Sequence, residues 1–456
     1  MSWKLEEIAE AVGGELIHAP DQEVEVTKVD TNSKEVKPGS IFVPIIAERD
    51  GHDFLESAIE EGAVASFWSQ DADDAPAGFP LILVEDTEKA LDAFAKYHVQ
   101  KAAPKVVGIT GSNGKTTTKD MTEAVLRRKY KTHKTPGNEN NQLGVPRTIL
   151  SMPEDTEILI LEMGMSAPGE ISVLSELGEP DVAVVTMIGE SHIQAFGSRE
   201  KLAQEKLDIL VGLKEGGLFI YPNNEPLITE QFDHDIRHQS FGKDDQDNLY
   251  ATDVVGDTRT TSFSVVQDGK DLTIALPVPG EYNVQNALMA ILIGLEFDVE
   301  IEEAKKGLEA LELTKNRLEW IDGKDDVQLL NDAYNASPTS MKAALEYFGD
   351  AEVEGERIAV LGDILELGEA SKEFHESIAD AIDIEKYKAV LLYGEEMSAL
   401  YELLKSNDNV RYFTGEKDDL IAAIQETAGP GDAVLFKSSN GTGLLAVVDK
   451  LRKEEN

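Results

Sequence analysis

The sequence predicts an α/β protein built from three domains. Its 456 residues are enough for about two to four domains of ordinary size. Over most of the chain, short apolar runs typical of buried strands alternate with helix-like segments. The pattern changes near Pro104 and again near Lys315. We therefore expect a small mixed α/β domain at 1–102, a central α/β domain of the P-loop ATPase type at 103–314, and a C-terminal Rossmann-like α/β domain at 315–456.

The first domain is expected to begin with a helix that opens at 2–5 and ends at the Gly13-Gly14 pair. Its apolar face is formed by Leu5, Ile8, Ala9 and Val12. Short apolar runs follow at 41–46 and 81–84, with turns between them. Residues 101–104 are the expected connector to the central domain.

Apolar runs also predict the strands of the two larger domains. In the central domain these runs are 106–110, 158–161 and 182–186, and the stretch 276–280 leads into a helix at 282–295. In the C-terminal domain they are 327–330, 358–361, 389–393 and 433–436. Helix-like segments separate the runs, so a doubly wound α/β domain followed by a second open α/β sheet is expected.

Composition excludes several classes of function. The chain has no cysteine, which excludes disulfides, thiolate metal sites and a cysteine nucleophile. Its net charge of −45 would repel nucleic acid and anionic lipid surfaces. The first ten residues carry three glutamates and no apolar core of a signal peptide, and no uncharged apolar stretch is long enough to span a membrane. We expect a cytoplasmic protein without membrane insertion, acting as a monomer.

A glycine-rich loop lies between a predicted strand and a predicted helix. It comprises Gly111, Ser112, Asn113, Gly114, Lys115 and Thr116, and Thr117 follows. The backbone N–H groups of such a loop can surround phosphate oxygens. Lys115 is placed to pair with the β- and γ-phosphates and the Thr116 hydroxyl to bind Mg²⁺, although Ile109 stands where the usual pattern has its first glycine. The loop predicts an ATP site.

Polar residues follow the next two strands of the central domain. Glu162 closes the run 158–161, and a carboxylate at that edge of a parallel sheet is a suitable Mg²⁺ ligand. His192 follows the third strand and could bind a metal or orient a phosphate group. The alternatives are a solvated loop glutamate and an ordinary loop histidine. By pattern alone Lys206 is an exposed helix lysine, and the histidine spacing does not support a zinc hydrolase.

Several segments, in the correct order, resemble the Mur ligases. The phosphate loop matches the family's Thr-Gly-x-x-Gly-Lys-Thr version over Thr110 to Thr116. The segment 135–146 resembles the substrate-side loop, and 332–338 and 361–368 resemble C-domain signatures of the members that add D-alanyl-D-alanine. The tail 437–442 differs from the Lys-Gly-Ser-Arg version of many members, and a substrate or phosphate contact is expected there.

The resemblance implies further site residues. Glu162 and His192 match metal-site positions, and Lys206 matches a lysine that is carbamylated in relatives and helps to organise a second Mg²⁺. The nucleotide contacts it implies are Asn283 and Asn286 on the adenine side and Arg317 and Asp332 from the C-terminal domain. The substrate contacts it implies are Thr31 and Ser33, beside the basic Lys34, and Asn138, Asn140, Asn141, Gln142 and Asn335.

The implied activity is that of an ATP-dependent, ADP-forming ligase of peptidoglycan precursor synthesis. ATP and Mg²⁺ would be its cofactors, and UDP-N-acetylmuramoyl-tripeptide and D-alanyl-D-alanine its substrates. Phosphoryl transfer to the tripeptide carboxylate would give an acyl phosphate, which the amine then attacks. Lys115, Lys206 and His192 are the expected catalytic residues.

Three alternatives were weighed. A Mur ligase that adds the third peptide residue carries Asp-Tyr-Ala-His where this chain has Asp332-Ala-Tyr334-Asn335, and its Asp-Asn-Pro-Arg motif is absent. A folylpolyglutamate synthetase-like ligase carries an Asp-Gly-Ala-His-Asn-Pro type motif, also absent. A non-catalytic ATP-binding scaffold would have no need of Lys115, Glu162 and Lys206 together.

Overall fold

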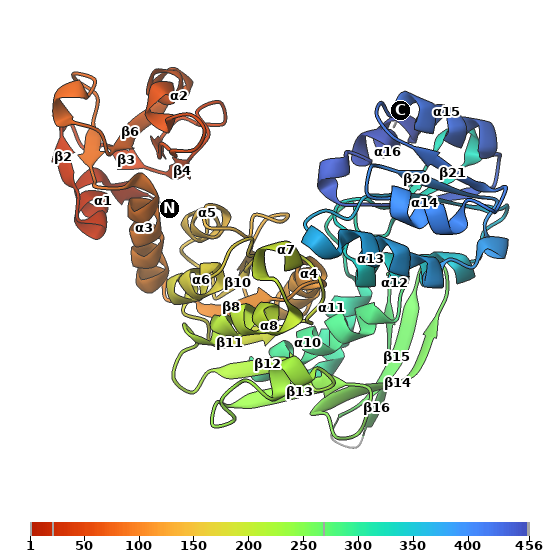
Figure 1. Cartoon of the computed structure of the whole chain (residues 1–456). Helices are drawn as coiled ribbons and strands as arrows, with labels where there is room; N and C mark the ends of the chain where they lie inside the picture. Colours follow the sequence, from red (N-terminus) through yellow and green to blue (C-terminus); the bar gives the residue numbers. More distant parts are fainter. Residues whose placement is uncertain (1, 21, 268–269, 454–456) are drawn as a thin grey trace.

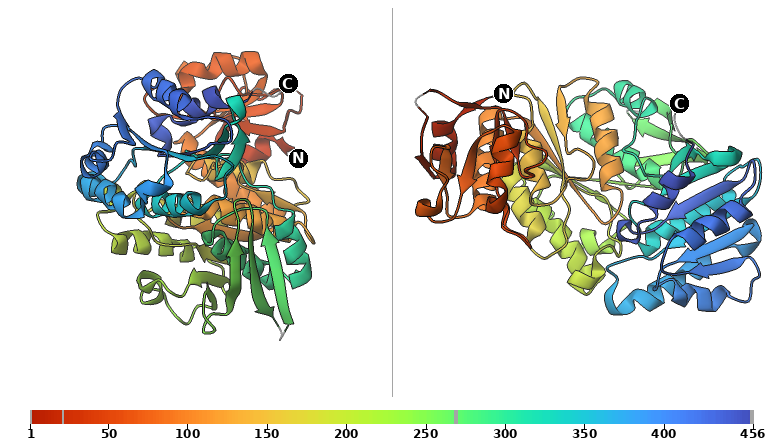
Figure 2. Two further views of the ribbon diagram at one scale, coloured as in Figure 1. Left: turned by 90° about the vertical axis from the view of Figure 1, so that its right-hand side faces the viewer. Right: turned by 90° about the horizontal axis from the view of Figure 1, so that it is seen from above.

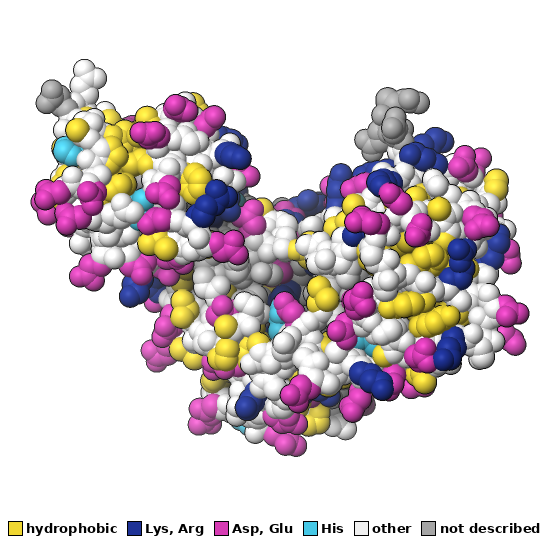
Figure 3. Space-filling model, turned by 45° about the horizontal axis from the view of Figure 1, so that its top comes forward, with side chains coloured by type: hydrophobic (Ala, Val, Ile, Leu, Met, Phe, Trp, Pro, Cys, Tyr) yellow, Lys and Arg dark blue, Asp and Glu magenta, His cyan; other side chains and the backbone are white. Residues whose placement is uncertain are grey.

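The computed structural model describes residues 2–20, 22–267 and 270–453. It holds three main sheets, of five, nine and six strands, and confirms the predicted α/β class. The three parts lie in a row along the molecule, and the first and third rise from the same side of the central one (Figures 1 and 2). A broad hollow separates them in the space-filling view, and acidic side chains are scattered over both outer parts (Figure 3).

The first part is built on a five-stranded sheet in the order β2-β7-β6-β5-β4. Its strands are β2 (Glu15–Ile17), β4 (Lys28–Asp30), β5 (Ser40–Phe42), β6 (Ala63–Trp68) and β7 (Leu81–Leu83). Its helices are α1 (Leu5–Val12), α2 (Leu55–Glu61) and α3 (Thr87–Ala102). β2 runs antiparallel to β7, and the other pairs are parallel.

Two boundaries differ from the sequence prediction. The first helix begins at Leu5 and not at Ser2, because β1 (Trp3–Lys4) pairs with β3 (Glu25–Val26). Gly13 ends the helix as predicted, with a left-handed φ of 64° that glycine adopts without strain. The predicted connector is shorter than expected, since α3 continues through Ala102.

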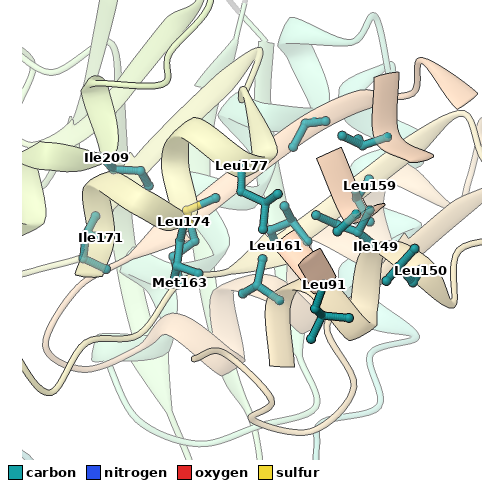
Figure 4. Packing of buried hydrophobic residues seen from close by; sticks show 14 of the residues in the cluster. Leu91, Ile149, Leu150, Leu159, Leu161, Met163, Ile171, Leu174, Leu177 and Ile209 are labelled. Atoms are coloured by element: carbon teal, nitrogen blue, oxygen red, sulfur yellow. The ribbon is translucent and has the colours of Figure 1, made fainter. Parts of the chain in front are cut away.

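Helix α3 fixes the first part to the central one. It packs on α5 (Gly144–Leu150) and lies beside α6 (Glu170–Gly178). Leu91 of α3 lies against Ile149 and Leu150 of α5, in a buried cluster that reaches Leu161 in the central sheet (Figure 4). Full burial of one leucine side chain contributes about 2 kcal/mol. A shared core of this kind holds the two parts together.

The central sheet has the order β16-β15-β14-β13-β12-β11-β8-β10-β9. Its strands are β8 (Lys105–Thr110), β9 (Thr132–Lys134), β10 (Ile158–Glu162), β11 (Val182–Val185), β12 (Leu218–Pro222), β13 (His238–Gly242), β14 (Leu249–Gly256), β15 (Thr261–Gln267) and β16 (Lys270–Leu276). Strands from β9 to β14 pair in parallel, and β14, β15 and β16 form an antiparallel extension. The three predicted strands are β8, β10 and β11, and they are confirmed.

Helices cover both faces of the parallel strands. Successive side chains of a strand point to opposite faces of the sheet, and here the side chains on both faces are apolar. Val106 and Val107 of β8, for example, belong to separate hydrophobic clusters on the two faces. The helices of this part are α4 (Lys115–Leu126), α5, α6, α7 (Ile193–Phe196), α8 (Arg199–Leu207), α9 (Pro226–Thr229), α10 (Tyr282–Glu296) and α11 (Ile301–Glu309). The helix predicted at 282–295 is therefore confirmed as α10.

The third part is an open sheet in the order β17-β18-β22-β19-β20-β21. Its strands are β17 (Glu319–Asp322), β18 (Gln328–Asp332), β19 (Arg357–Gly362), β20 (Ala389–Tyr393), β21 (Val410–Phe413) and β22 (Ala433–Lys437). Its helices are α12 (Pro338–Asp350), α13 (Ser371–Glu376), α14 (Ser398–Leu404), α15 (Asp418–Thr427) and α16 (Leu445–Leu451). Only β17 is antiparallel, and the four predicted strands are confirmed as β18, β19, β20 and β22.

The turn between β14 and β15 reaches the third part. The Thr258 carbonyl accepts hydrogen bonds from Trp320 Nε1 at 3.2 Å and from the Tyr347 hydroxyl at 2.5 Å. The Thr258 hydroxyl lies 2.7 Å from the Glu352 amide nitrogen, which donates to it. The antiparallel extension therefore supports the third part at a point remote from the phosphate loop (Figure 1). In the described ranges, no helix has the length and apolar character needed to cross a membrane.

Candidate active site

The phosphate loop joins β8 to the N-terminus of α4, as predicted. Two glycines are required by close approach as well as by conformation. Gly111 has φ 146°, and a Cβ there would lie 1.8 Å from the Thr186 hydroxyl oxygen. Gly114 has φ 83°, and its Cβ would lie 2.7 Å from Asn286 Oδ1. The loop backbone therefore stays close to its neighbours and presents the first N–H groups of α4 to a phosphate group.

Lys115 folds back over this loop. Its ammonium group donates to the Gly111 carbonyl oxygen at 2.8 Å. Enclosure of the ammonium group lowers the pKa of Lys115, and the positive charge of Arg317 lowers it further, while Glu162 opposes both. A phosphate group would replace the carbonyl as the partner of Lys115 and restore its charge balance. Thr117 is half-buried in the first turn of the same helix.

Glu162 accepts two hydrogen bonds at the end of β10. The Thr116 hydroxyl donates to Glu162 Oε1 at 3.1 Å, and Asn140 Nδ2 donates to the same oxygen at 2.7 Å. Glu162 is buried, so the alternative of a solvated loop glutamate is wrong. The sequence placed Asn140 on the substrate side, and the structure brings it to the carboxylate expected to bind metal.

Lys119 is a site residue that the sequence analysis missed. It lies one turn after Lys115 on α4, is fully buried, and places Nζ 3.3 Å from Glu162 Oε2. This contact is an ion pair without hydrogen-bond geometry, so Oε2 has no hydrogen-bond partner. The spacing of four residues from Lys115 was the available signal, because it puts both lysines on one face of the helix.

The donor set fits Mg²⁺. Thr116 and Glu162 supply a hydroxyl and a carboxylate, the hard oxygen ligands that Mg²⁺ prefers together with phosphate and water. Glu162 Oε2 accepts no hydrogen bond, so a metal ion at this oxygen would have to displace only its ion pair with Lys119. Among the described residues, no group of three or more acidic or histidine side chains gathers in one place. The arrangement therefore suits an ion that arrives with a nucleotide.

Lys206 and His192 lie on the other side of the phosphate loop. Lys206, on α8, is 2% exposed, so the alternative of an exposed helix lysine is wrong. Burial lowers the pKa of Lys206 well below its usual range, and the charge of Lys115 adds to the shift. His192 has φ 63°, and its Nδ1 contacts the carboxylate of Glu366, from the third part. Burial lowers the pKa of His192, assisted by the charges of Lys115 and Lys206 and opposed by Glu366.

Asn283 and Asn286 are buried in the first turns of α10, beside the phosphate loop. Asn286 Nδ2 donates to Asn283 Oδ1 at 3.0 Å, and Asn286 Oδ1 accepts from the Thr118 hydroxyl at 3.2 Å. The two predicted asparagines therefore contact one another. They lie on the flank of the loop next to Gly114.

Residues of the third part are linked to one another by contacts, and one of them, Arg317, reaches the loop electrostatically. The Arg317 guanidinium lies 4.5 Å from the centre of the Tyr334 ring, and the charge of Arg317 reaches Lys115. Asp332 pairs with Lys437 at 2.7 Å, and Lys437 also donates to the Asn335 carbonyl oxygen at 2.7 Å. Burial lowers the pKa of Lys437, and Asp332 opposes that shift.

A direct contact also joins the loop to the third part. Asn113 Nδ2 lies 3.1 Å from the Ser337 hydroxyl oxygen. Ser337 caps the N-terminus of α12 and accepts from the Ser340 amide. Neither contact was expected from the sequence, because a serine before a proline signals only a helix start.

Three of the remaining predicted substrate residues, Thr31, Ser33 and Asn138, are next in the chain to residues that line a cavity between the first and central parts, but do not line it themselves. This cavity, of about 830 Å³, is lined by residues that include Lys28, Asp30, Lys34, Lys37, Glu139 and Arg147. Ser33 is buried and Thr31 half-buried in the same loop. Glu139 lines the cavity and Asn140 reaches Glu162, so the cavity leads toward the phosphate loop.

The other predicted residues of the substrate-side loop differ in their contacts and exposure. Asn141 Oδ1 accepts from the Gly144 amide at 2.9 Å and so fixes the start of α5. Asn138 is exposed and Gln142 half-buried. The structure gives Asn141 a local structural contact in addition to any contact with substrate.

Comparisons with known proteins cover nearly the whole chain. The Mur ligase middle domain matches residues 109–294, and the "Mur ligase, glutamate ligase domain" matches residues 316–440. The chain is 43% identical over 448 residues to a UDP-N-acetylmuramoyl-tripeptide--D-alanyl-D-alanine ligase of Bacillus subtilis, with 97% of each sequence covered. It is 31% identical to the ligase of the same name from Escherichia coli, with 99% of each covered.

Solved structures agree. MurF from Acinetobacter baumannii superposes with a TM-score of 0.87 at 29% identity, covering 99% of both chains. MurF from Thermotoga maritima in complex with ADP gives 0.80 at 27% identity, covering 93% of this chain and 96% of that one. A folylpolyglutamate synthase of Mycobacterium tuberculosis, at 14% identity and a TM-score of 0.61, shares the fold alone. With these matches and a crevice that holds Lys115, Thr116, Glu162 and Lys206, the chain belongs to the Mur ligase family.

Proposed function

We propose that this protein is an ATP-dependent, ADP-forming ligase that joins D-alanyl-D-alanine to UDP-N-acetylmuramoyl-tripeptide in peptidoglycan precursor synthesis. The observation that carries the proposal is the group of side chains at one phosphate loop, which comprises Lys115, the Thr116–Glu162 pair and the buried Lys206. Ligases of that name, 43% and 31% identical over nearly the full chain, support the choice of substrates.

The chemistry explains why the crevice needs these groups. A carboxylate is a poor electrophile, so its oxygen first attacks the γ-phosphorus of ATP, and ADP leaves. The amine then attacks the acyl carbon, and inorganic phosphate leaves as the amide forms. Both steps place extra negative charge on phosphoryl oxygens, which positioned cations and N–H donors stabilise. The protein therefore acts by charge and position.

The site residues divide these tasks. We assign the γ-phosphate to Lys115 and the loop N–H groups from Gly111 to Thr116. Thr116 and Glu162 would hold Mg²⁺, which neutralises phosphate charge when it is bound. Lys206 and His192 would act on the second side of the transferred group. Asn283, Asn286, Arg317 and Asp332 would hold the nucleotide, with the last two contributed by the third part.

The substrate assignments follow the cavity and the loops beside it. We propose that Thr31, Ser33, Asn138, Asn140, Asn141 and Gln142 bind the nucleotide-linked tripeptide, and that Asn335 lies on the same path. Lysines 28, 34 and 37 and Arg147 line the cavity in a chain of net charge −45, and cations there suit a diphosphate. We further propose a cytoplasmic monomer with domains at 1–102, 103–314 and 315–456.

The proposal is tested by phosphate release from ATP with purified protein. Release should require both the nucleotide-linked tripeptide and D-alanyl-D-alanine, and a product heavier by the dipeptide minus water should appear by mass spectrometry. The rival activity, addition of the third peptide residue, is tested with a diamino acid and the UDP-N-acetylmuramoyl-dipeptide as substrates. Turnover with that pair, and none with D-alanyl-D-alanine, would overturn the assignment.

A further inference from the structure

The candidate active site has a charge problem that the proposed reaction must solve. Lys115 and Arg317 are cations whose charges act on one another, and both suit anionic ligands. The proposed acceptor, however, approaches as a cationic amine. Like charges at these separations disfavour its binding, so a carboxylate has to meet the amine at the crevice.

The other acidic side chains near the loop already have partners within the protein and are less exposed. Glu162 accepts from Thr116 and Asn140 and lies near Lys119. Asp332 is paired with the buried Lys437. Glu190 accepts from the Thr339 hydroxyl at 2.7 Å. Among the described residues, these carboxylates hold the protein's own groups together.

Glu366 differs in exposure and in position. Its side chain is 57% exposed, and its carboxylate contacts Nδ1 of His192 across the interface between the central and third parts. His192 in turn lies within electrostatic reach of Lys115 and Lys206. An ionised carboxylate has about four lone-pair positions, so Glu366 can hold His192 and accept an ammonium group together. One of its oxygens contacts His192, and the exposed carboxylate leaves room for a second partner.

The backbone holds Glu366 in this place. The residue has φ 64°, a left-handed conformation that costs a non-glycine residue about 1 kcal/mol or more. Its carbonyl accepts from the Gln194 amide at 3.1 Å, and α7 lies beside residues 366–370 (Figure 1). Gly368, at φ 62°, packs against Gln194, where a Cβ would lie 3.1 Å from Gln194 Cγ. Two contacts with Gln194 of α7 therefore hold the strained segment in place.

The segment before Glu366 is fixed to the tail at 437–442. The Leu365 amide donates to the Ser439 hydroxyl at 2.9 Å, and the Ser439 amide donates to the Asp363 carbonyl at 3.1 Å. This tail is thus a support for the loop that carries Glu366. Recognition of a small cation requires a carboxylate that its surroundings hold in one position, and these hydrogen bonds hold the segment that carries Glu366.

We propose that Glu366 binds the ammonium group of the incoming dipeptide, so that once this group has lost a proton to solvent its nitrogen lies in position to attack the acyl carbon of the acyl phosphate. The inference rests on the proposed function, since it assumes a cationic amine as acceptor. It assigns to the third part a contact with the acceptor in addition to its contacts with the nucleotide. Glu366 can bind the ammonium group because its carboxylate is negatively charged. Glutamine has nearly the same shape but no charge, so it should bind the ammonium group much more weakly.

The test compares Glu366→Gln and Glu366→Asp with the matched control Glu369→Gln, an exposed glutamate in the same segment. Steady-state constants are measured for D-alanyl-D-alanine, ATP and the nucleotide-linked tripeptide. In Glu366→Gln the KM for the dipeptide should rise about tenfold, the value of one charged hydrogen bond. The KM values for ATP and the tripeptide should stay near those of the unmodified protein, and Glu366→Asp should recover part of the loss.

Hydroxylamine separates recognition of the amine from an indirect effect through His192. It is largely uncharged at neutral pH and traps acyl phosphates as hydroxamates. The ratio of kcat/KM for the dipeptide to that for hydroxylamine should fall about tenfold in Glu366→Gln. An equal loss for both nucleophiles, or no change in the KM for the dipeptide, overturns the inference. If the unmodified protein forms no amide with D-alanyl-D-alanine, the proposed function itself fails.

Discussion

The Thr116 hydroxyl donates to Glu162 Oε1 across 3.1 Å, joining the first turn of α4 to the end of β10. This hydrogen bond places two oxygen ligands on one side of the phosphate loop and leaves Glu162 Oε2 without a hydrogen-bond partner. Two residues 46 positions apart are therefore arranged for a cation before one binds.

Glu162→Gln should raise the Mg²⁺ concentration needed for half-maximal activity. An amide oxygen is a weaker ligand than a carboxylate, and loss of one ligand group costs about 10- to 100-fold in metal affinity or activity. Glutamine can keep the hydrogen bonds from Thr116 and Asn140 but removes the negative partner of the buried Lys119, so thermal melting is measured beside activity. A Mg²⁺ titration of phosphate release measures the effect, and an unchanged half-saturation would remove Glu162 from the metal site.

Lys115→Ala should abolish ligation and leave the fold intact. The ammonium group contacts only loop carbonyls, so its loss removes a ligand-binding charge and little packing. By the scale of a lost charge-stabilising group, kcat should fall by about 10²–10³. Turnover and thermal melting are measured together. Near-normal turnover at an unchanged melting temperature would remove the phosphate-loop assignment.

Asp332→Asn should weaken ATP binding more than binding of the nucleotide-linked tripeptide. Asp332 lies on the third part, in contact with Lys437, whereas the cavity assigned to the tripeptide lies between the other two parts. Asparagine is preferred to alanine because it keeps the shape of the side chain and an oxygen to which Lys437 can donate, which limits the cost of about 3–5 kcal/mol that removing one partner of a buried pair carries. Calorimetry with each ligand separately measures the two affinities, and equal losses would count against the assignment.

Sequence reasoning found the residues whose chemistry is tied to a local pattern. Lys115 and Thr116 follow a glycine-rich turn, and Glu162 directly follows an apolar run, so both positions could be read along the chain. Lys119 was missed although its spacing from Lys115 was a signal, because a lysine inside a helix usually points to solvent. Only the packing of α4 against β10 shows that this one is buried beside Glu162.

The antiparallel extension escaped prediction for a different reason. The large apolar side chains that β15 and β16 bury alternate along each strand, as at Phe263 and Val265 and at Ile274 and Leu276. Ser264 separates the first two and Thr273 precedes Ile274, so no long run of large apolar residues marks either strand. The contact of Glu366 with His192 is also invisible in the sequence, because 174 positions separate two residues that meet only when two domains are packed (366 − 192).

Asp92→Asn should stabilise the protein at pH 8. Burial within α3 raises the pKa of Asp92 from 3.8 to about 6, and the charges of Glu88 and Asp86 add to the shift. The folded state therefore holds the proton more tightly than the unfolded state. The resulting penalty is absent below the unfolded pKa, grows as pH rises toward 6, and is complete above it. The gain at pH 8 should be about 1–3 kcal/mol.

Thermal or urea unfolding at several pH values measures this effect. The difference between Asp92→Asn and the unmodified protein should shrink as pH falls from 8 to 4. A constant difference would mean that asparagine acts through packing or helix propensity and not through the charge of Asp92.

Lys206 is expected to act as a carbamate formed with CO₂. A bare ammonium group would repel Mg²⁺, whereas a carbamate offers anionic oxygens of the kind that Mg²⁺ prefers. The buried position lowers the pKa of Lys206 well below its usual range, which favours the neutral amine that reacts with CO₂. The same burial would be costly for an unpaired charge, so modification also resolves the charge conflict with Lys115.

Lys206→Ala should therefore lose activity by about 10²–10³, the scale of a missing electrostatic group. The space left lacks a small carboxylate, so added formate or acetate should restore part of the activity. Lys115→Ala is the matched control, since its missing group is a cation that these anions cannot replace. The mass of the intact protein, measured with and without bicarbonate, should differ by one CO₂ per chain in the unmodified protein and not in Lys206→Ala. Full activity of Lys206→Ala in CO₂-depleted buffer would show that Lys206 has no part in the reaction.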